Sequence, residues 1–239
     1  MNAYSVIESE MKRILDLKYH RRFFEMIDRA ARLNPVIERY RFDLKQYGEL
    51  RNAIVHDRSG GEVIAEPNDS VVAAIEHVAR LLVEPPRVIP AFRKDVLTLS
   101  AGDSVSKAIR EMSKHSYTQA PIMKGDDLLG LLTSNMIVEW MGLSMAGNLY
   151  DLENTTLGDI FRLVGNKGNY QVVAEDKSLF DIPDLFYHCQ IEGHKLDAVL
   201  ITQTGGVNEP FLGIITNRDL SHAVQLISQN YRKKKKDSS

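Results

Sequence analysis

The sequence predicts an α+β protein in which an N-terminal helical bundle is followed by two β-α-β-β-α repeats. Three observations support this prediction. Apolar residues recur at helical spacing through the first third of the chain. Further on, the segment Gly213–Asp219 has a degraded copy in Gly130–Met136, 83 residues earlier. In both copies an apolar pair precedes the glycine, an apolar run leads to a threonine, and a helical pattern follows, so one supersecondary unit is written twice.

The composition is that of a globular protein and excludes several classes of protein. Of the 239 residues, 44% are hydrophobic and 26% are charged, and the formal net charge of −2 gives no general attraction to nucleic acid or membrane. No apolar run approaches the roughly 20 residues of a membrane span, and the N-terminus lacks the apolar core of a signal peptide. The single Cys189 excludes an intrachain disulfide. We therefore expect a cytoplasmic protein with no membrane association.

The first region, residues 1–85, is predicted to be helical. Apolar residues recur at helical spacing near both of its ends, at Ile7, Met11 and Ile14 and then at Val71, Ile75, Val78 and Leu82. The step from Asn34 to Pro35 marks a break, because proline removes a donor and restricts the residue before it. Residues 36–57 contain few helix breakers and are expected to form one long helix.

The second region, residues 86–228, contains the repeat. Short apolar runs bounded by turn residues predict three strands in each half, at 96–99, 119–122 and 128–133 and then at 171–173, 198–201 and 211–216. A helix is expected after the first and the third strand of each half. Pro183 lies inside one of these helices, which should therefore be short, late or kinked. The lysine-rich residues 229–239 are expected to form a disordered basic tail.

This order of elements, the strand containing Ala120, Pro121 and Ile122, and the pattern Gly-apolar-apolar-Thr-x-x-Asp at 213–219 resemble the CBS domain. Two such repeats in tandem resemble the CBS pair, or Bateman module. The resemblance implies a first CBS domain at about 90–145 and a second at 156–228. In that family the two halves form a pseudo-symmetric unit with up to two clefts, which commonly bind adenine nucleotides. The resemblance thus implies a sensor of AMP, ADP or ATP, and it leaves S-adenosylmethionine and a cyclic dinucleotide open as alternatives.

Thr216 and Asp219 are the central candidates for such a cleft. The resemblance implies that the aspartate holds the ribose hydroxyls and that the threonine lies near the phosphate. An ionised carboxylate accepts two hydrogen bonds, as a diol requires, and a helix N-terminus offers unpaired N–H groups to a phosphate. The same Thr-x-x-Asp pattern also fits a capping box, in which the acid bonds only to the cap N–H. The complete set of predicted nucleotide-site residues is Thr216, Arg218, Asp219, Thr133, Ala120 and Pro121.

The two copies differ at the position of the carboxylate. The first copy keeps Thr133 but has Met136 where the second has Asp219. A methionine cannot bind a diol, so one competent cleft, associated with Asp219, is expected.

In the N-terminal region, Arg51 and His56 resemble the Arg-x4-6-His motif of HEPN domains. These domains are small helical bundles, and many of them are metal-independent ribonucleases. Asn52 fits the polar residue that often follows the arginine in such members. An arginine stabilises the charge of a phosphorane, and a histidine can move protons at a ribose 2′-OH. Arg51 and His56 lie about 140° apart around a helix, so they would act together only in a composite site across a dimer. The spacing alone is a weak signal, because Arg110 and His115 share it.

The sequence therefore predicts a homodimeric regulatory protein in which a nucleotide-binding CBS pair controls a HEPN-like domain that cleaves RNA through Arg51, Asn52 and His56. The alternative is a noncatalytic module whose helical domain serves only dimerisation or partner recruitment. No metal site is predicted, since His188, Cys189 and His194 offer too few ligands at no recognised spacing.

Overall fold

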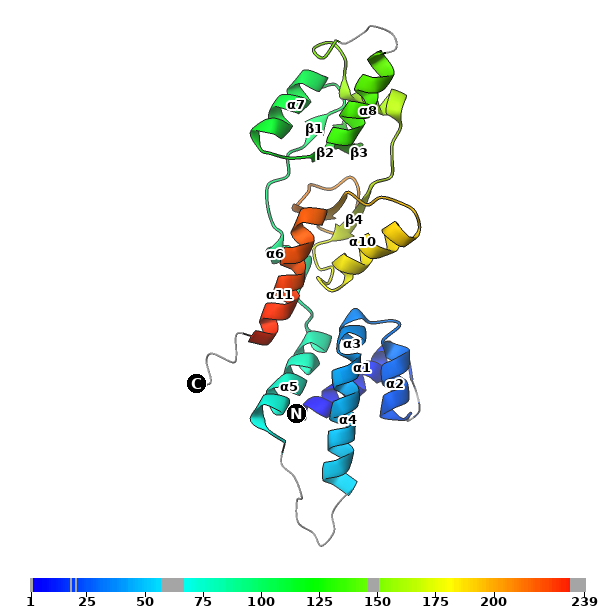
Figure 1. Ribbon diagram of the computed structural model, residues 1–239, viewed down its shortest axis with the longest axis vertical. Coiled ribbons are helices and arrows are strands. Elements are labelled where there is room, and N and C mark those ends of the chain that lie inside the picture. The colour runs from blue at the N-terminus through cyan, green and yellow to red at the C-terminus, as the bar shows by residue number, and fades with distance from the viewer. Residues whose placement is uncertain (1, 18, 20, 57–66, 146–150, 233–239) are drawn as a thin grey trace. The chain divides into compact units, whose positions relative to one another are not determined.

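The computed structural model describes residues 2–17, 19, 21–56, 67–145 and 151–232 (Figure 1). The chain divides into two compact units. One comprises the residues up to Pro86 together with Ser178–Asp181 and the residues from Val224 on, and the other comprises Arg87–Lys177 and Ile182–Ala223. Most of the predicted basic tail, residues 233–239, lies outside the described residues.

The first unit is a helical bundle. In the described part of the chain up to Pro86 its helices are α1 (Ala3–Ile14), α2 (Phe23–Ala30), α3 (Pro35–Arg39), α4 (Arg41–His56) and α5 (Asp69–Val83) (Figure 1). Ile7 of α1, Ile27 of α2 and Leu44 of α4 are completely buried, so their apolar faces form the core of the bundle. Asn34 begins α3 by accepting hydrogen bonds from the backbone N–H groups of two residues in its first turn.

The single long helix predicted for residues 36–57 is wrong. The chain leaves helical geometry at Tyr40 (φ −101°, ψ 15°), which separates α3 from α4. The Tyr40 ring is buried and lies edge-on to the ring of His77 in α5, with centroids 6.2 Å apart. Packing of Tyr40 on a distant helix thus outweighs the local preference for a continuous helix, and no glycine or proline marks the break.

The second unit contains two three-stranded sheets of identical topology. The first sheet consists of β1 (Leu99–Ser100), β2 (Gln119–Lys124) and β3 (Asp127–Thr133), and the second of β4 (Tyr170–Ala174), β5 (Ala198–Thr202) and β6 (Gly213–Thr216). In each sheet the first strand is parallel to the second, and the second is antiparallel to the third. The predicted α+β fold, with a helical bundle before two β-α-β-β repeats, is confirmed.

In the described part of the chain after Pro86, the helices complete these repeats. They are α6 (Val88–Ala91), α7 (Val105–Lys114), α8 (Ser134–Met145), α9 (Leu157–Val164), α10 (Asp181–Ile191), the 3-10 turn η1 (Asn217–Asp219) and α11 (Leu220–Arg232). Pro183 lies in the first turn of α10, where its missing N–H leaves no helical bond unmade. The helix therefore begins late, which is one of the three outcomes predicted for it. No helix in the described ranges combines the length and the apolar character needed to cross a membrane.

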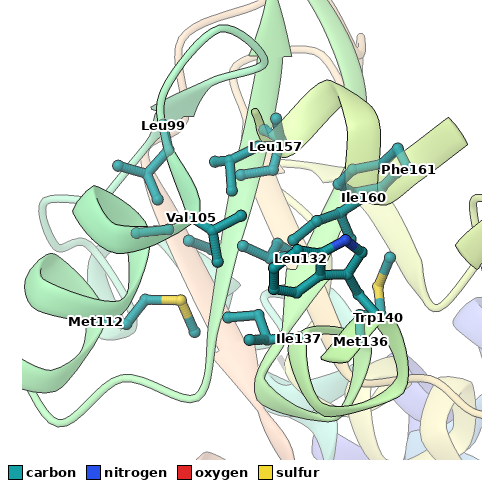
Figure 2. Packing of buried hydrophobic residues seen from close by; sticks show 13 residues of the cluster. Leu99, Val105, Met112, Leu132, Met136, Ile137, Trp140, Leu157, Ile160 and Phe161 are labelled. Carbon is teal, nitrogen blue, oxygen red and sulfur yellow. The ribbon is translucent and has the colours of Figure 1, made fainter. Parts of the chain in front are cut away.

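A buried hydrophobic cluster joins α7, α8 and α9 to one face of the first sheet (Figure 2). The sheet contributes Ala120, Ile122 and Leu132, which occupy one face because side chains alternate along a strand. Met136 of α8 is buried in this cluster. The residue that replaces the carboxylate in the first copy is therefore part of the core.

Leu132→Ala is expected to destabilise the second unit by about 2–5 kcal/mol, because it removes a completely buried side chain and leaves a cavity. Leu143→Ala is the matched control, since Leu143 lies on α8 but is 51% exposed, and its effect should stay within about 0.5 kcal/mol. Urea unfolding can be followed by the fluorescence of Trp140, the single tryptophan, which lies in the same cluster. Equal unfolding midpoints for the two variants would contradict this assignment of the core.

Candidate functional site

A pocket of about 230 Å³ lies between the two halves of the second unit. Three segments form its walls: the chain before β1, the loop before β2 with the start of that strand, and the end of β6 with the turn after it. The lining residues are Lys94, Asp95, Val96, Leu97, His115, Ser116, Tyr117, Thr118, Gln119, Pro121, Ile214, Thr216, Arg218 and Asp219.

Strand alternation decides which predicted residues reach this pocket. On β2, Gln119 and Pro121 line it, whereas Ala120 between them faces the helix-covered core. On β6, Ile214 and Thr216 line it, and Ile215 is completely buried on the opposite face. Of the six residues that the sequence predicted for nucleotide sites, Thr216, Arg218, Asp219 and Pro121 therefore meet at one pocket, while Ala120 and Thr133 are not among its lining residues.

The two carboxylate oxygens of Asp219 have different partners. Oδ2 accepts hydrogen bonds from the backbone N–H and from the hydroxyl of Thr216, both at 2.8 Å. Oδ1 lies 3.8 Å from Nζ of Lys94, which also lines the pocket. Asp219 thus caps the start of the following helix with one oxygen and keeps its other oxygen beside a cation.

The segment Thr156–Asp159 shows that the Thr-x-x-Asp pattern can serve as a helix cap alone. Asp159 Oδ2 accepts from the backbone N–H and the hydroxyl of Thr156, at 3.0 and 2.6 Å, and Oδ1 accepts from Arg162 at 2.9 Å. The bonds from Thr156 lower the pKa of the Asp159 carboxyl below its ordinary value. Asp159 is not among the lining residues of the pocket. Its position in the pocket, more than the pattern, distinguishes Asp219.

In the first copy of the pattern, the threonine caps a helix. The hydroxyl of Thr133 accepts a hydrogen bond from the backbone N–H of Met136 at 3.2 Å, and so caps α8. Both side chains are buried. No carboxylate is present at this helix start to face a ligand.

Gly213 allows the two halves to approach closely enough to form the pocket. A Cβ at Gly213 would collide with the carbonyl oxygen of Phe92. Next to this contact, Arg93 pairs with Gly213 in an antiparallel bridge, and the backbone N–H of Lys94 donates to the carbonyl of Leu212 at 3.1 Å. The segment that leads into the first half is thus attached to the last strand of the second half.

Gly130 has the reciprocal role. A Cβ at Gly130, in the first half, would lie 2.6 Å from the ring of Phe161 on α9, the helix that leads into the second half. Each half therefore provides a glycine against which the leading segment of the other half packs.

Sequence reasoning missed Lys94 and the pair of His115 and Tyr117. The two rings stack with centroids 5.3 Å apart and an interplanar angle of 17°, and both residues line the pocket. These residues lie in irregular segments before β1 and β2, where no periodicity or motif marks them.

The structure gives Arg51 a packing role in the first unit. Its guanidinium lies 5.0 Å from the centroid of the Tyr4 ring, in a cation–π arrangement. The Tyr4 ring also stacks on Phe23, with centroids 4.3 Å apart, and burial raises the pKa of Tyr4 to about 12, although the Arg51 charge opposes this shift. Asn52 is exposed on α4. His56 ends α4, and its side chain lies outside the described residues.

No group of three or more His, Cys, Asp or Glu residues is arranged to hold a metal ion within the described ranges.

Gly213→Ala is expected to destabilise the second unit by about 1–3 kcal/mol, because the backbone at Phe92 must move to admit the methyl group. Gly142→Ala on α8 is the control. Nothing lies within 4 Å of a Cβ added there, and alanine in a helix interior should stabilise by about 0.5–1 kcal/mol. Thermal unfolding of both variants tests the contact, and a Gly213→Ala protein as stable as the wild type would refute it.

Residues 89–142 match the family profile of the CBS domain. A search of curated proteins gives no match to the chain. Several solved structures are similar. A putative signal-transduction protein with CBS domains from Burkholderia ambifaria has 18% identity and a TM-score of 0.42, covering 54% of this chain and 82% of that one. The CBS domain pair of protein MJ0100, in complex with 5′-methylthioadenosine and S-adenosyl-L-methionine, has 19% identity and a TM-score of 0.42, covering 59% and 97%.

A third similar structure, CBSX2 in complex with AMP, has 14% identity and a TM-score of 0.42, covering 58% of this chain and 96% of that one. At these scores, the architecture of the second unit is defined by its own strand order and by the profile match. Residues 89–142 match the CBS domain, and the strands that follow repeat the topology of its sheet, so the second unit contains two repeats of this topology.

Proposed function

We propose that the second unit is a regulatory module that binds an adenine nucleotide in the pocket at Asp219. The observation that carries this proposal is the meeting of three kinds of group in one pocket: a carboxylate with one outward oxygen, two cationic side chains, and a stacked aromatic pair beside apolar walls. These groups match the ribose, the phosphate and the base of a nucleotide.

Asp219 suits the ribose. An ionised carboxylate has about four acceptor positions, and Thr216 uses those of Oδ2. Oδ1 lies 3.8 Å from Lys94 Nζ, beyond the length of a normal hydrogen bond, so it can accept from a vicinal diol.

The phosphate is best placed near the start of the helix that follows β6. Backbone N–H groups at a helix start point outward and attract anions. Arg218 lies in that first turn, and Lys94 lies on the opposing wall. Both bring positive charge to the same end of the pocket.

The remaining walls suit a planar base. Pro121 and Ile214 provide apolar surface, and the stacked rings of His115 and Tyr117 provide a flat edge. The volume of about 230 Å³ is small, since pockets for drug-sized ligands usually measure roughly 300–1,000 Å³. This size favours a mononucleotide over a cyclic dinucleotide. The adenosine-containing ligands of the MJ0100 pair and of CBSX2 belong to the same chemical class, but the proposal rests on the pocket.

Asp219→Ala should weaken nucleotide binding by about tenfold or more, because it removes a charged acceptor of hydrogen bonds from the ribose. Asp159→Ala is a matched control, since it removes the carboxylate of an equivalent Thr-x-x-Asp cap outside the pocket. Calorimetric titration with AMP, ADP and ATP measures the affinity of each protein. Absence of binding by the wild type would refute the proposed function, and an equal loss in both variants would attribute the effect to capping.

We further propose that the bound nucleotide controls the first unit. Such control requires that the nucleotide bind two arrangements of the protein with different affinity. For that unit, the contact between Arg51 and the buried Tyr4 ring favours the noncatalytic alternative, dimerisation or partner recruitment, over a ribonuclease. The contact with Tyr4 gives Arg51 a structural role on α4, so a catalytic role is not needed to account for this arginine.

Incubation of labelled RNA with the wild type, Arg51→Ala and His56→Ala tests this choice. We expect no cleavage by any of the three proteins, and a destabilised Arg51→Ala protein because a cation–π contact worth about 0.5–2 kcal/mol is lost. Cleavage by the wild type that both substitutions abolish would instead establish the HEPN-type ribonuclease. Light scattering on the same samples determines whether the protein is a homodimer.

A further inference from the structure

We propose that Lys94 makes the pocket select a phosphorylated nucleoside over the uncharged nucleoside, by moving its ammonium from Asp219 to the ligand phosphate. This inference rests on the proposed nucleotide function and assigns a specificity-determining residue to that site.

The backbone of Lys94 is fixed at the pocket, whereas its side chain can move. Its N–H donates to the carbonyl of Leu212, and the preceding residue, Arg93, pairs with Gly213. The backbone of Lys94 is thus held beside β6, the strand that ends at Thr216. The Lys94 side chain is 41% exposed, so its ammonium can turn toward a ligand without leaving a buried position.

Lys94 and the ribose would compete for the same oxygen. Thr216 occupies Oδ2 of Asp219 from two directions, and the Lys94 ammonium stands 3.8 Å from Oδ1. That separation exceeds a normal hydrogen bond. The ion pair is loose and partly exposed, so its separation costs little if the ammonium gains another anion.

The two kinds of ligand differ in whether they offer the displaced Lys94 ammonium a new anionic partner. An uncharged nucleoside that occupies Oδ1 displaces the ammonium and offers no anion in exchange. A nucleoside phosphate occupies Oδ1 with its diol and presents its phosphate to the displaced ammonium, which forms a charge-assisted hydrogen bond. Lys94 thus lowers the affinity for the nucleoside and raises the affinity for the nucleotide, and the discrimination between them comes from both effects.

The comparison between the two halves supports a paired role for Lys94 and Asp219. Leu99 pairs with Ile122, and Val173 pairs with Ile201 in the equivalent register, so Gly168 occupies the place of Lys94 five residues before the strand position. Met136 occupies the place of Asp219. The neighbouring Lys167 bonds instead to Glu139 on α8 at 3.0 Å. The pair of positions that corresponds to Lys94 and Asp219 in the other arrangement of the halves, Gly168 and Met136, thus lacks both charges, as expected for two charges that act together.

Lys94→Met, a substitution that keeps the length and removes the charge, is the central variant. Lys107→Met is the matched control, because Lys107 forms a lysine–aspartate pair with Asp103 at 2.7 Å in the same unit, outside the pocket. Calorimetric titration with AMP and with adenosine, in low and in high salt, gives the ratio of the two affinities. Thermal unfolding of each variant verifies that it is folded.

We expect the wild type and Lys107→Met to prefer AMP, and Lys94→Met to bind AMP about tenfold more weakly while it binds adenosine as well as or better than the wild type. Lys94→Arg should retain the preference, and high salt should reduce it in the wild type. A wild type that binds neither compound would refute the proposed nucleotide function. A wild type that binds AMP, with an unchanged AMP-to-adenosine ratio in folded Lys94→Met or an equal change in Lys107→Met, would refute the role of Lys94 alone.

Discussion

The contact between Gly213 and the backbone of Phe92 is the constraint on which the pocket depends. Because a side chain at Gly213 would collide with the Phe92 carbonyl, the chain that enters the first half can run directly beside the last strand of the second half. The hydrogen bond from Lys94 to Leu212 then fixes the register between these segments. Lys94 and Asp219, from opposite ends of the second unit, consequently lie 3.8 Å apart.

The two halves have the same strand topology but differ in the side chain at one position of the repeated pattern. In the second half the residue three places after the β6 threonine is a carboxylate that lines a pocket, and in the first half it is Met136, buried among aromatic and aliphatic side chains. Both residues follow a threonine that caps or helps to cap the next helix. The cap preserves the local turn while the side chain three residues on is free to serve either packing or recognition.

Local patterns in the sequence were sufficient to predict the duplication and the turn that brings Thr216, Arg218 and Asp219 to the pocket. The glycine, the threonine and the apolar run between them are consecutive, so one segment contains all the information about that turn. The break at Tyr40 depends on its packing against His77, and the places of Lys94 and Tyr117 depend on the pairing of the halves, so neither has a local signature. Ala120 was predicted as a site residue together with Pro121 from the resemblance to the CBS domain, yet strand alternation turns it to the other face.

Helix α9 has a consequence for where the first CBS domain ends. The family match stops at residue 142, but Leu157, Ile160 and Phe161 of α9 complete the hydrophobic cluster of that domain. A fragment limited to the matched residues would expose Leu132 and Trp140 to water on the side that α9 covers, and would lose the ring that packs on Gly130. The cooperative folding unit is therefore larger than the recognisable domain, and the two repeats, although separable by sequence comparison, should unfold in a single transition.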